Sequence, residues 1–210
     1  MARPGLGSES PPTLFLVDGD PLARRLIQPL LSQASYALET YSCAQALLAN
    51  GPGDRPGCVI TELRLPDMDG LALQAALRQQ RCRQPVLFLS AHADVAAAVR
   101  AIKAGAIDFL LKPCAGEVLA AAVAGAIALD SKYRKERHDK AALQARFDTL
   151  TLQENKICRL VAEGLVNKEI ASDLKIAEQT VRLHRHRAMR KIAANSVADL
   201  MRLLTAIASD

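Results

Sequence analysis

The sequence contains no tryptophan, and aromatic residues make up only 3% of its 210 residues. Proteins that hold single-stranded nucleic acid stack the bases on aromatic side chains, so this kind of binding is not expected. Long apolar segments are also missing: the longest, 118–129, has twelve residues, too few to cross a bilayer. Residues 1–12 are rich in Pro, Gly and Ser. We expect this N-terminus to be disordered, with no secretory signal and no membrane partner.

Metal-binding and catalytic motifs are missing as well. The five cysteines (Cys43, Cys58, Cys82, Cys114 and Cys158) include no C-x-x-C pair, which argues against a zinc site. Their odd number fits reduced thiols and a cytoplasmic location. The sequence has no G-x-x-x-x-G-K-[ST], G-x-S-x-G or H-E-x-x-H motif, and these mark common nucleotide, hydrolase and zinc-protease sites. We therefore expect no catalytic residues, no bound metal and no enzyme of a familiar kind.

Charge is unevenly divided along the chain. Lys and Arg number 27 against 22 Asp and Glu, and half of the residues are hydrophobic, enough to build folded cores. Residues 1–129 contain 11 basic and 11 acidic residues, whereas residues 130–210 contain 16 and 11. The whole surplus of +5 therefore lies in the C-terminal part. This predicts a neutral N-terminal module and a basic module with an anionic partner.

Apolar runs typical of strands alternate with helical patterns over roughly the first 125 residues. The strand-like runs are Thr13–Asp18, Ala37–Tyr41, Cys58–Glu62, Val86–Ser90 and Asp108–Leu111, and the helical patterns are Pro21–Ala34, Ala44–Ala49, Leu71–Gln80, Ala93–Ala104 and one that begins near Gly116. This order predicts a doubly wound α/β fold, a parallel sheet with helices on both faces. Functional groups in such folds gather at the carboxyl ends of the strands. Those ends carry Asp18, Glu62, Ser90 and Lys112.

The last sixty residues or so predict an all-α domain of four helices. Thr151 and Glu154 have the spacing of a capping box, which starts a helix ending at Gly164. Further helices are predicted from Asn167, from Glu178 to Ile192 and from Ser196 to Ala208. The third is strongly basic and follows the second after a tight turn, the pattern of a helix-turn-helix. Its buried stripe is expected at Val181, Ala188 and Ile192, with Arg182, Arg185 and His186 facing outward. Residues 129–148 are charged and predict a helical linker.

The segment LTLQENKICRLVAEGLVNKEIASDLKIAEQTVRLHRHRAMRKI, residues 150–192, resembles the LuxR/GerE-type DNA-binding domain of the NarL/FixJ response regulators. The resemblance implies double-stranded DNA as the partner and a homodimer that binds two half-sites. The positions matched to base edges in the major groove are Arg182, Leu183 and His186, and those matched to phosphates are Lys168, Thr180 and Arg185. Arg190 completes the predicted DNA-binding set. The helix Ser196–Ala208 and the linker are both candidate dimer surfaces.

The segments LVDGDP, TELRLPDMDG, LSAHAD and AGAIDFLLKP resemble those of a response-regulator receiver domain. The resemblance implies a (βα)5 receiver-like domain in which Asp18, Ser90, Lys112 and the switch aromatic Phe109 are retained. Two parts differ. Glu62 stands at the position of the phosphoacceptor aspartate, and Gly19 replaces the second acid of the metal-binding pair. Glycine supplies no ligand to Mg²⁺, which demands a nearly ideal octahedron of oxygens. We therefore expect no cofactor, with Asp20 as the alternative metal ligand.

Glu62 is interpreted as a partial and permanent imitation of the phosphorylated state. A phosphoryl group brings about −1.5 to −2 charges and three acceptor oxygens, whereas a glutamate brings one charge and two oxygens. The hypothesis is a receiver that is active-like without phosphorylation. One alternative is that Glu62 pairs with Lys112 and holds an inactive conformation. Another is a regulator still phosphorylated, weakly or at Asp67 or Asp69.

Together these patterns predict a sequence-specific DNA-binding transcription regulator. The domains are expected at 13–128 for the receiver-like domain, 129–148 for the linker and 149–210 for the DNA-binding domain. A hypothesis of a different class is a protein-interaction adaptor, whose partner binds the receiver surface at Ala93–Ala104 and Asp108–Lys112. RNA polymerase and a sensor kinase are further candidate partners.

Overall fold

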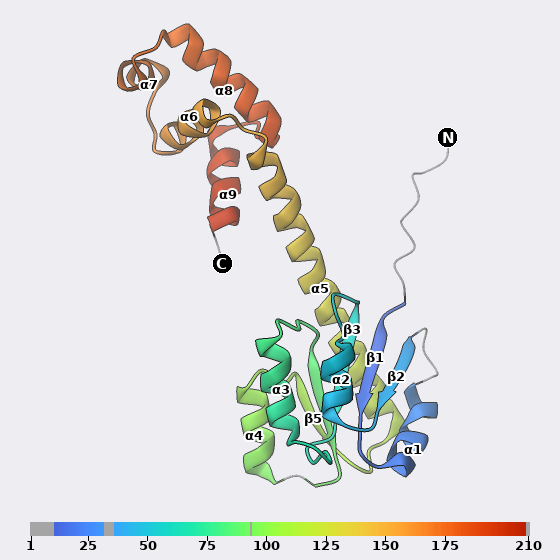
Figure 1. Cartoon of the computed structure of the whole chain (residues 1–210). Helices are drawn as coiled ribbons and strands as arrows, with labels where there is room; N and C mark the ends of the chain where they lie inside the picture. Colours follow the sequence, from blue (N-terminus) through green and yellow to red (C-terminus); the bar gives the residue numbers. More distant parts are fainter. Residues whose placement is uncertain (1–10, 32–35, 93, 209–210) are drawn as a thin grey trace, which may run out of the picture. The chain divides into compact units, whose positions relative to one another are not determined.

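The computed structural model of the chain describes residues 11–31, 36–92 and 94–208. By its internal contacts the chain divides into two compact units, with the division after Arg134. Each unit is described by itself below (Figure 1). Residues 1–10 of the segment predicted to be disordered lie outside the described residues, as do residues 32–34 and 93 of two predicted helices. The predicted domain bounds stay predictions.

The first unit is built on a five-stranded parallel sheet, as predicted. Its strands are β1 (Thr13–Val17), β2 (Ala37–Tyr41), β3 (Gly57–Thr61), β4 (Val86–Ser90) and β5 (Asp108–Leu111). They lie in the order β2-β1-β3-β4-β5. All residues of β1, β3 and β4 are buried, because helices cover both faces of a parallel sheet and leave its central strands no solvent-facing side.

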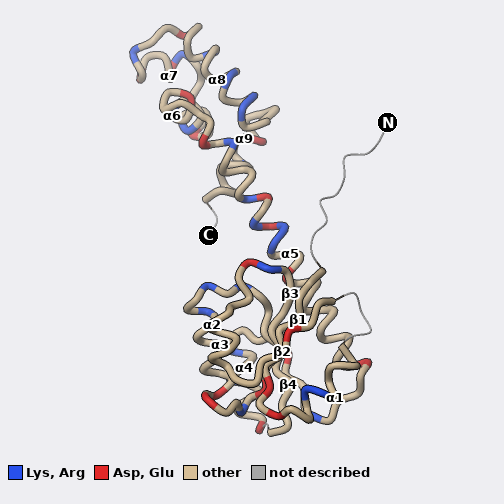
Figure 2. The backbone as a smooth tube through the Cα atoms, turned by 45° about the vertical axis from the view of Figure 1, so that its right-hand side comes forward, with Lys and Arg blue, Asp and Glu red and all other residues tan. Residues whose placement is uncertain are grey.

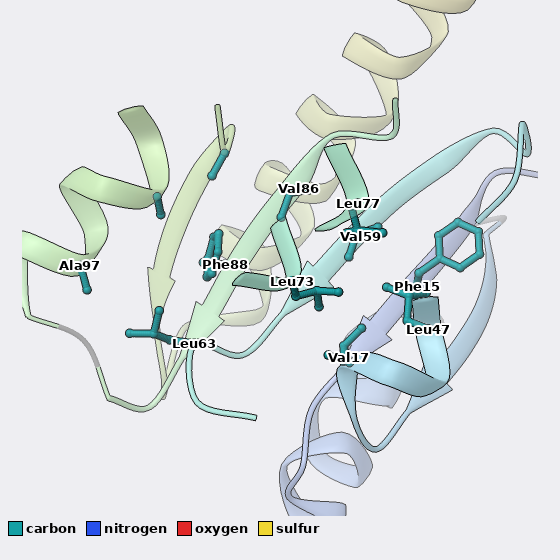
Figure 3. Packing of buried hydrophobic residues seen from close by; sticks show 13 residues of the cluster. Phe15, Val17, Leu47, Val59, Leu63, Leu73, Leu77, Val86, Phe88 and Ala97 are labelled. Atoms are coloured by element: carbon teal, nitrogen blue, oxygen red, sulfur yellow. The ribbon is translucent and has the colours of Figure 1, made fainter. Parts of the chain in front are cut away.

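Five helices cover the sheet in two layers. They are α1 (Pro21–Leu31), α2 (Ala44–Asn50), α3 (Gly70–Gln79), α4 (Val95–Lys103) and the first part of α5 (Gly116–Asp148). On one face, α2, α3 and α4 pack against alternate strand residues such as Phe15, Val59 and Phe88 (Figure 3). On the other face, α1 and α5 pack against the intervening residues such as Leu14 and Ile60. The period of two along each strand thus fills both cores.

The strand register sets which side chains meet at the carboxyl edge of the sheet. Val17 pairs with Thr61, so Asp18 and Glu62 follow side by side in the loops that leave β1 and β3. Both residues were predicted as the last of their strands, and both lie one position beyond. Ser90 pairs with Leu111, so Lys112, the next residue after β5, lies at the same edge of the sheet as Ser90. The neighbouring order of β1, β3, β4 and β5 therefore gathers these four side chains at one end of the sheet.

Helix α5 is continuous over 33 residues, so the helix predicted to begin near Gly116 and the predicted helical linker form one helix. Its final turns carry Leu143 and Phe147, and both pack into the core of the second unit. The last turns of the charged segment therefore pack on the second unit, whereas most of residues 131–142 are exposed. Neither α5 nor any other helix in the described part of the chain is long and apolar enough to cross a membrane.

The second unit contains α6 (Leu152–Ala162), α7 (Asn167–Leu174), α8 (Glu178–Ile192) and α9 (Val197–Ala208). Thr151 and Glu154 form the predicted capping box. The first helix was predicted to reach Gly164, but α6 ends two residues earlier. The predicted stripe of α8 is confirmed, because Val181, Ala188 and Ile192 are fully buried. They form one core with side chains of α6, α7 and α9.

Candidate functional site

Four predicted residues meet in a pocket at the carboxyl end of the sheet, which we call the strand-end pocket: Asp18, Glu62, Ser90 and Lys112. Lys112 Nζ donates to Glu62 Oε2 over 2.9 Å and also to Asp18 Oδ2. Ser90 Oγ donates to Glu62 Oε1. Asp18, Glu62 and Ser90 are buried, with exposed fractions of 2%, 6% and 0%. The pocket therefore holds two buried carboxylates that share one ammonium group.

The carboxylate of Glu62 is fully occupied by hydrogen-bond donors. Besides the hydroxyl of Ser90 and the ammonium of Lys112, the main-chain N–H of Leu63 donates to Oε1 over 2.7 Å and that of Ala91 to Oε2 over 3.0 Å. Burial by itself would raise the pKa of Glu62. The hydrogen bonds from Ser90, Lys112 and Ala91 outweigh it and hold the pKa below its ordinary value. Glu62 is therefore ionised at neutral pH.

Lys112 is held in its charged form by the two acids. Burial tends to lower its pKa, but the hydrogen bonds to Asp18 and Glu62 reverse that effect and raise it above the ordinary value. Asp18 Oδ1 also accepts the main-chain N–H of Asp20 over 2.9 Å. Both oxygens of Asp18 thus have partners, Oδ1 in the N–H of Asp20 and Oδ2 in the ammonium of Lys112.

Gly19 and Asp20 follow Asp18 in the loop between β1 and α1. Gly19 lies beneath Pro66: a Cβ atom built on it would be 2.8 Å from Pro66 Cδ and 2.9 Å from Pro66 Cγ. A side chain at this position therefore requires the proline to move. Asp20 is exposed and accepts the main-chain N–H of Leu22 over 2.8 Å. Its carboxylate satisfies the start of α1, as capping aspartates do.

Phe109, the predicted switch aromatic, is half-buried on β5. Its ring stacks on that of Phe88, with centroids 5.4 Å apart and planes 5° from parallel. It packs against the core cluster beneath α2, α3 and α4. The aromatic side chain thus packs on the sheet core and remains partly exposed.

Two acids that the sequence left open as phosphorylation sites cap helices. Asp67 accepts the main-chain N–H groups of Ala44 and Gln45 over 3.0 and 2.8 Å, and so satisfies the first turn of α2 from a distant loop. Asp69 is the N-cap of α3 and accepts the N–H of Leu71 over 2.7 Å. Helix N-termini need such acceptors because their first N–H groups have no partner within the helix.

The second unit has a groove along α8, a helix on which Lys and Arg recur (Figure 2). The groove has a volume of about 510 Å³, and its walls include four predicted DNA-binding residues, Arg182, Arg185, His186 and Arg190. Lys168, Leu183, His186 and Arg190 are exposed, and Thr180 is half-buried. The turn before α8 is closed by Lys175, whose φ of 53° is left-handed.

Three basic side chains of α8 are held by neighbours. Arg182 pairs with Glu178 over 2.9 Å and stays exposed. Arg185 was predicted to face outward, but it is half-buried and donates to Asn167 Oδ1 over 3.0 Å, because it lies beside the start of α7. Lys191 Nζ donates to the buried Glu154 over 2.6 Å and to the main-chain oxygen of Thr149 over 3.0 Å.

Several residues of both sites were missed by reasoning from the sequence. The N–H groups of Leu63 and Ala91 complete the shell of Glu62, Pro66 covers Gly19, and Asn167 orients Arg185. Main-chain donors leave no signal in side-chain identity. Pro66 and Asn167 lie within the quoted motifs TELRLPDMDG and residues 150–192. Their place in those motifs was the signal that could have identified them.

Comparison with family models agrees with this geometry. A parallel (βα)5 sheet with acids at its strand ends, joined to a helix-turn-helix unit, defines a response regulator with a DNA-binding output unit. Residues 14–124 match the response regulator receiver domain, and residues 148–204 match bacterial regulatory proteins of the luxR family.

Full-length proteins are similar over most of the chain. Nodulation protein W of Bradyrhizobium diazoefficiens is 35% identical over 190 residues, which cover 90% of this chain and 84% of that protein. The transcriptional regulatory protein FixJ of Rhizobium meliloti is 34% identical over 92% of this chain and 95% of its own. The solved structure of the response regulator StyR has a TM-score of 0.84 at 37% identity, covering 93% and 98% of the two chains. The chain belongs to the NarL/FixJ family of response regulators, a family of transcriptional regulators.

Proposed function

We propose that this protein is a sequence-specific DNA-binding transcription regulator whose receiver works without phosphotransfer, with Glu62 as the permanent anionic occupant of the strand-end pocket. The observation that carries the proposal is the shell around the Glu62 carboxylate. Ser90, Lys112 and the N–H of Ala91 all donate to it. The hydroxyl and the ammonium are the groups by which the resembling receivers hold phosphoryl oxygens.

The same shell argues against Glu62 as a phosphoacceptor. A carboxylate that attacks a phosphorus atom needs one oxygen free to face the donor, and each oxygen of Glu62 already accepts two hydrogen bonds. Phosphorylation at Asp67 or Asp69 would require a helix cap to open, because each satisfies the first turn of a helix.

The residues of the loop between β1 and α1 do not fit the Mg²⁺ ion on which receivers depend. Gly19 has no oxygen to offer beyond its main chain, and Pro66 occupies the space above it. Asp18 is bonded to Lys112 and to the N–H of Asp20. Mg²⁺ needs several oxygen ligands at close to octahedral angles, and these residues do not supply them.

The contacts favour an active-like arrangement over an inactive one held by the Glu62–Lys112 pair. An inactive conformation held by Glu62 and Lys112 needs only the ion pair between them. In this structure Ser90 and the segment that follows it also bond Glu62, through the Ser90 hydroxyl and the N–H of Ala91. The stacking of Phe109 on Phe88 places the aromatic residue in the core below that segment.

The output of the protein is binding of duplex DNA by the groove of α8. Its exposed side chains supply bidentate and charged donors for base edges and phosphates. We propose that two copies of the chain bind related half-sites about one helical turn apart, with α9 and the end of α5 as candidate dimer surfaces. RNA polymerase is the proposed partner at the promoter, and the regulator does not depend on a sensor kinase.

The test of this proposal is incubation of the full chain with a small phosphodonor and Mg²⁺, followed by intact-mass measurement. A receiver that has the phosphoacceptor aspartate is treated in parallel as the positive control. We expect the control to gain one phosphoryl group and this protein to stay unmodified. An acyl phosphate stable enough to be mapped on this chain would refute phosphorylation independence.

A mobility-shift assay with genomic fragments distinguishes a DNA-binding regulator from a protein-interaction adaptor. The regulator should shift some of the fragments, and the adaptor would shift none.

A further inference from the structure

Arg185 is the most buried of the three arginines that line the groove of α8. Arg182 and Arg190 are exposed, whereas Arg185 is half-buried beside the start of α7. Its charge also acts on the buried thiol of Cys158 on α6. Burial raises the pKa of that thiol to about 11, and the positive charge of Arg185 opposes the rise. Arg185 therefore carries its charge to the place where α6, α7 and α8 meet.

Asn167, the first residue of α7, holds the guanidinium of Arg185 in place. Arg185 Nη1 donates to Asn167 Oδ1 over 3.0 Å. Asn167 is itself half-buried and lines the same groove. A long side chain loses rotamer freedom when it binds a partner, and this loss weakens the binding. Because the bond to Asn167 orders Arg185 beforehand, less of that freedom is left to lose.

The bond fixes the guanidinium without cancelling its charge. The amide oxygen of Asn167 is neutral, and in the described part of the chain no carboxylate is paired with Arg185. Arg182 differs, because it is paired with Glu178 over 2.9 Å. A guanidinium carries several N–H donors, and a charge taken out of water without a counter-charge is costly. Arg185 thus presents to the groove an uncompensated cation that has donors to spare.

The groove around this pair suits an anion. Arg182 and Arg190 line it together with Arg185, and none of its described lining residues is an acid. Arginine forms charge-assisted hydrogen bonds to phosphate that are stronger than neutral ones. Most hydrogen bonds between proteins and duplex DNA go to phosphate and sugar, and these contacts fix the register of the protein on the duplex. A phosphate of the DNA backbone therefore matches the charge that Arg185 presents.

We propose that Asn167 is a positioning residue for DNA binding, which holds Arg185 so that the remaining N–H groups of its guanidinium meet a backbone phosphate. The inference rests on the proposed DNA-binding function and adds to it a residue of α7 that acts through Arg185. A neutral acceptor suits this role. An acid at position 167 would also fix the guanidinium, but it would cancel the charge that a phosphate requires.

The salt dependence of DNA binding by the full chain tests the role of Asn167. A genomic fragment bound by the wild type is titrated at several salt concentrations with no phosphodonor present. We expect Asn167→Ala to bind about fivefold more weakly and to reduce the slope of log K against log salt, in the direction of Arg185→Gln, which should lose about one. Asn155→Ala is the matched control. It removes the bond over 2.9 Å from Arg159 Nε to Asn155 Oδ1 on α6, outside the groove, and should change neither quantity. Unchanged affinity and slope in Asn167→Ala would overturn the proposal.

A double variant separates positioning from a merely structural role. If Asn167 acts through Arg185, Asn167→Ala should weaken binding by less than about twofold in the Arg185→Gln background. A loss as large as in the wild-type background would mean that Asn167 contacts DNA itself or only stabilises the fold, and it would contradict the assignment. If Asn167→Ala does not fold, Asn167→Ser, whose shorter side chain also removes the bond, takes its place in both experiments. A wild type that binds no fragment would refute the DNA-binding function and this inference with it, whereas a wild type that binds as tightly as Asn167→Ala refutes the inference alone.

Discussion

Replacing Lys112 by methionine tests the energetics of the strand-end pocket. Methionine keeps much of the length of the side chain and removes the only ammonium group that Asp18 and Glu62 share in the described pocket. The two buried carboxylates then face each other without a counter-charge. We therefore expect a large loss of stability of the first unit.

The magnitude follows from burial. Removing one partner of a buried ion pair costs about 3–5 kcal/mol. The Lys112 side chain is 15% exposed, and Glu62 keeps its bonds from Leu63, Ser90 and Ala91. We therefore expect a decrease of about 3 kcal/mol in the free energy of unfolding at pH 7. Lys103→Met, on the exposed end of α4, should change it by less than about 0.5 kcal/mol.

The pH dependence of the free energy of unfolding provides a second, independent test. In the wild type the pKa of Glu62 lies below its ordinary value of 4.5, so its contribution is present above pH 4.5 and is lost as the pH falls through the folded-state pKa. In the Lys112→Met variant, like charges raise the pKa of one carboxylate above its unfolded value. Protonation then relieves the repulsion. The stability difference between the two proteins should therefore shrink as the pH is lowered from 7 towards 4.5.

Tyrosine fluorescence during urea unfolding reports the first unit alone. The chain has no tryptophan, and its three tyrosines, Tyr36, Tyr41 and Tyr133, all precede the division after Arg134. A loss below about 1 kcal/mol, or a difference that stays constant with pH, would show that Lys112 does not neutralise the two acids.

Three further predictions concern single side chains. Glu62→Asp should still gain no phosphoryl group from a small phosphodonor, because Gly19 offers no carboxylate for Mg²⁺; detection of an acyl phosphate by mass contradicts this. Arg190→Gln should weaken binding to all DNA sequences alike and reduce the slope of log K against log salt by about one, whereas Arg202→Gln, paired with Asp199 on α9, should not. Glu154→Gln should destabilise α6 and α8 by about 1–3 kcal/mol, because it weakens the bond to Lys191. Amide hydrogen exchange of the two helices measures this loss, with the exposed Glu163→Gln as control. Equal exchange in both variants would refute the role of Glu154.

Local patterns made much of the fold predictable. The strands β2, β4 and β5 have the predicted bounds, because short apolar runs between turn residues depend on local sequence. The capping box of Thr151 and Glu154 has a fixed spacing that needs no tertiary context. The meeting of Glu62 with Ser90 and Lys112 follows from strand order alone, since parallel strands end at one edge.

The remaining features depend on contacts between distant segments. The bond between Lys112 and Asp18 joins residues 94 positions apart, and Asp67 caps α2 from 23 positions away. The positions of Pro66 over Gly19 and of Arg185 beside Asn167 are set by packing of loops and helices, for which periodicity carries no information.

The most direct test of the central claim compares the DNA bound by the wild type and by Glu62→Ala. Genomic fragments are recovered with the wild-type protein, and the affinity of both proteins for those fragments is measured with no phosphodonor present. If Glu62 holds Ser90 and Lys112 as a phosphoryl group would, as proposed, Glu62→Ala should bind at least about tenfold more weakly, equivalent to about 1.4 kcal/mol. Tighter binding by Glu62→Ala would show that Glu62 holds the inactive state and would contradict the account.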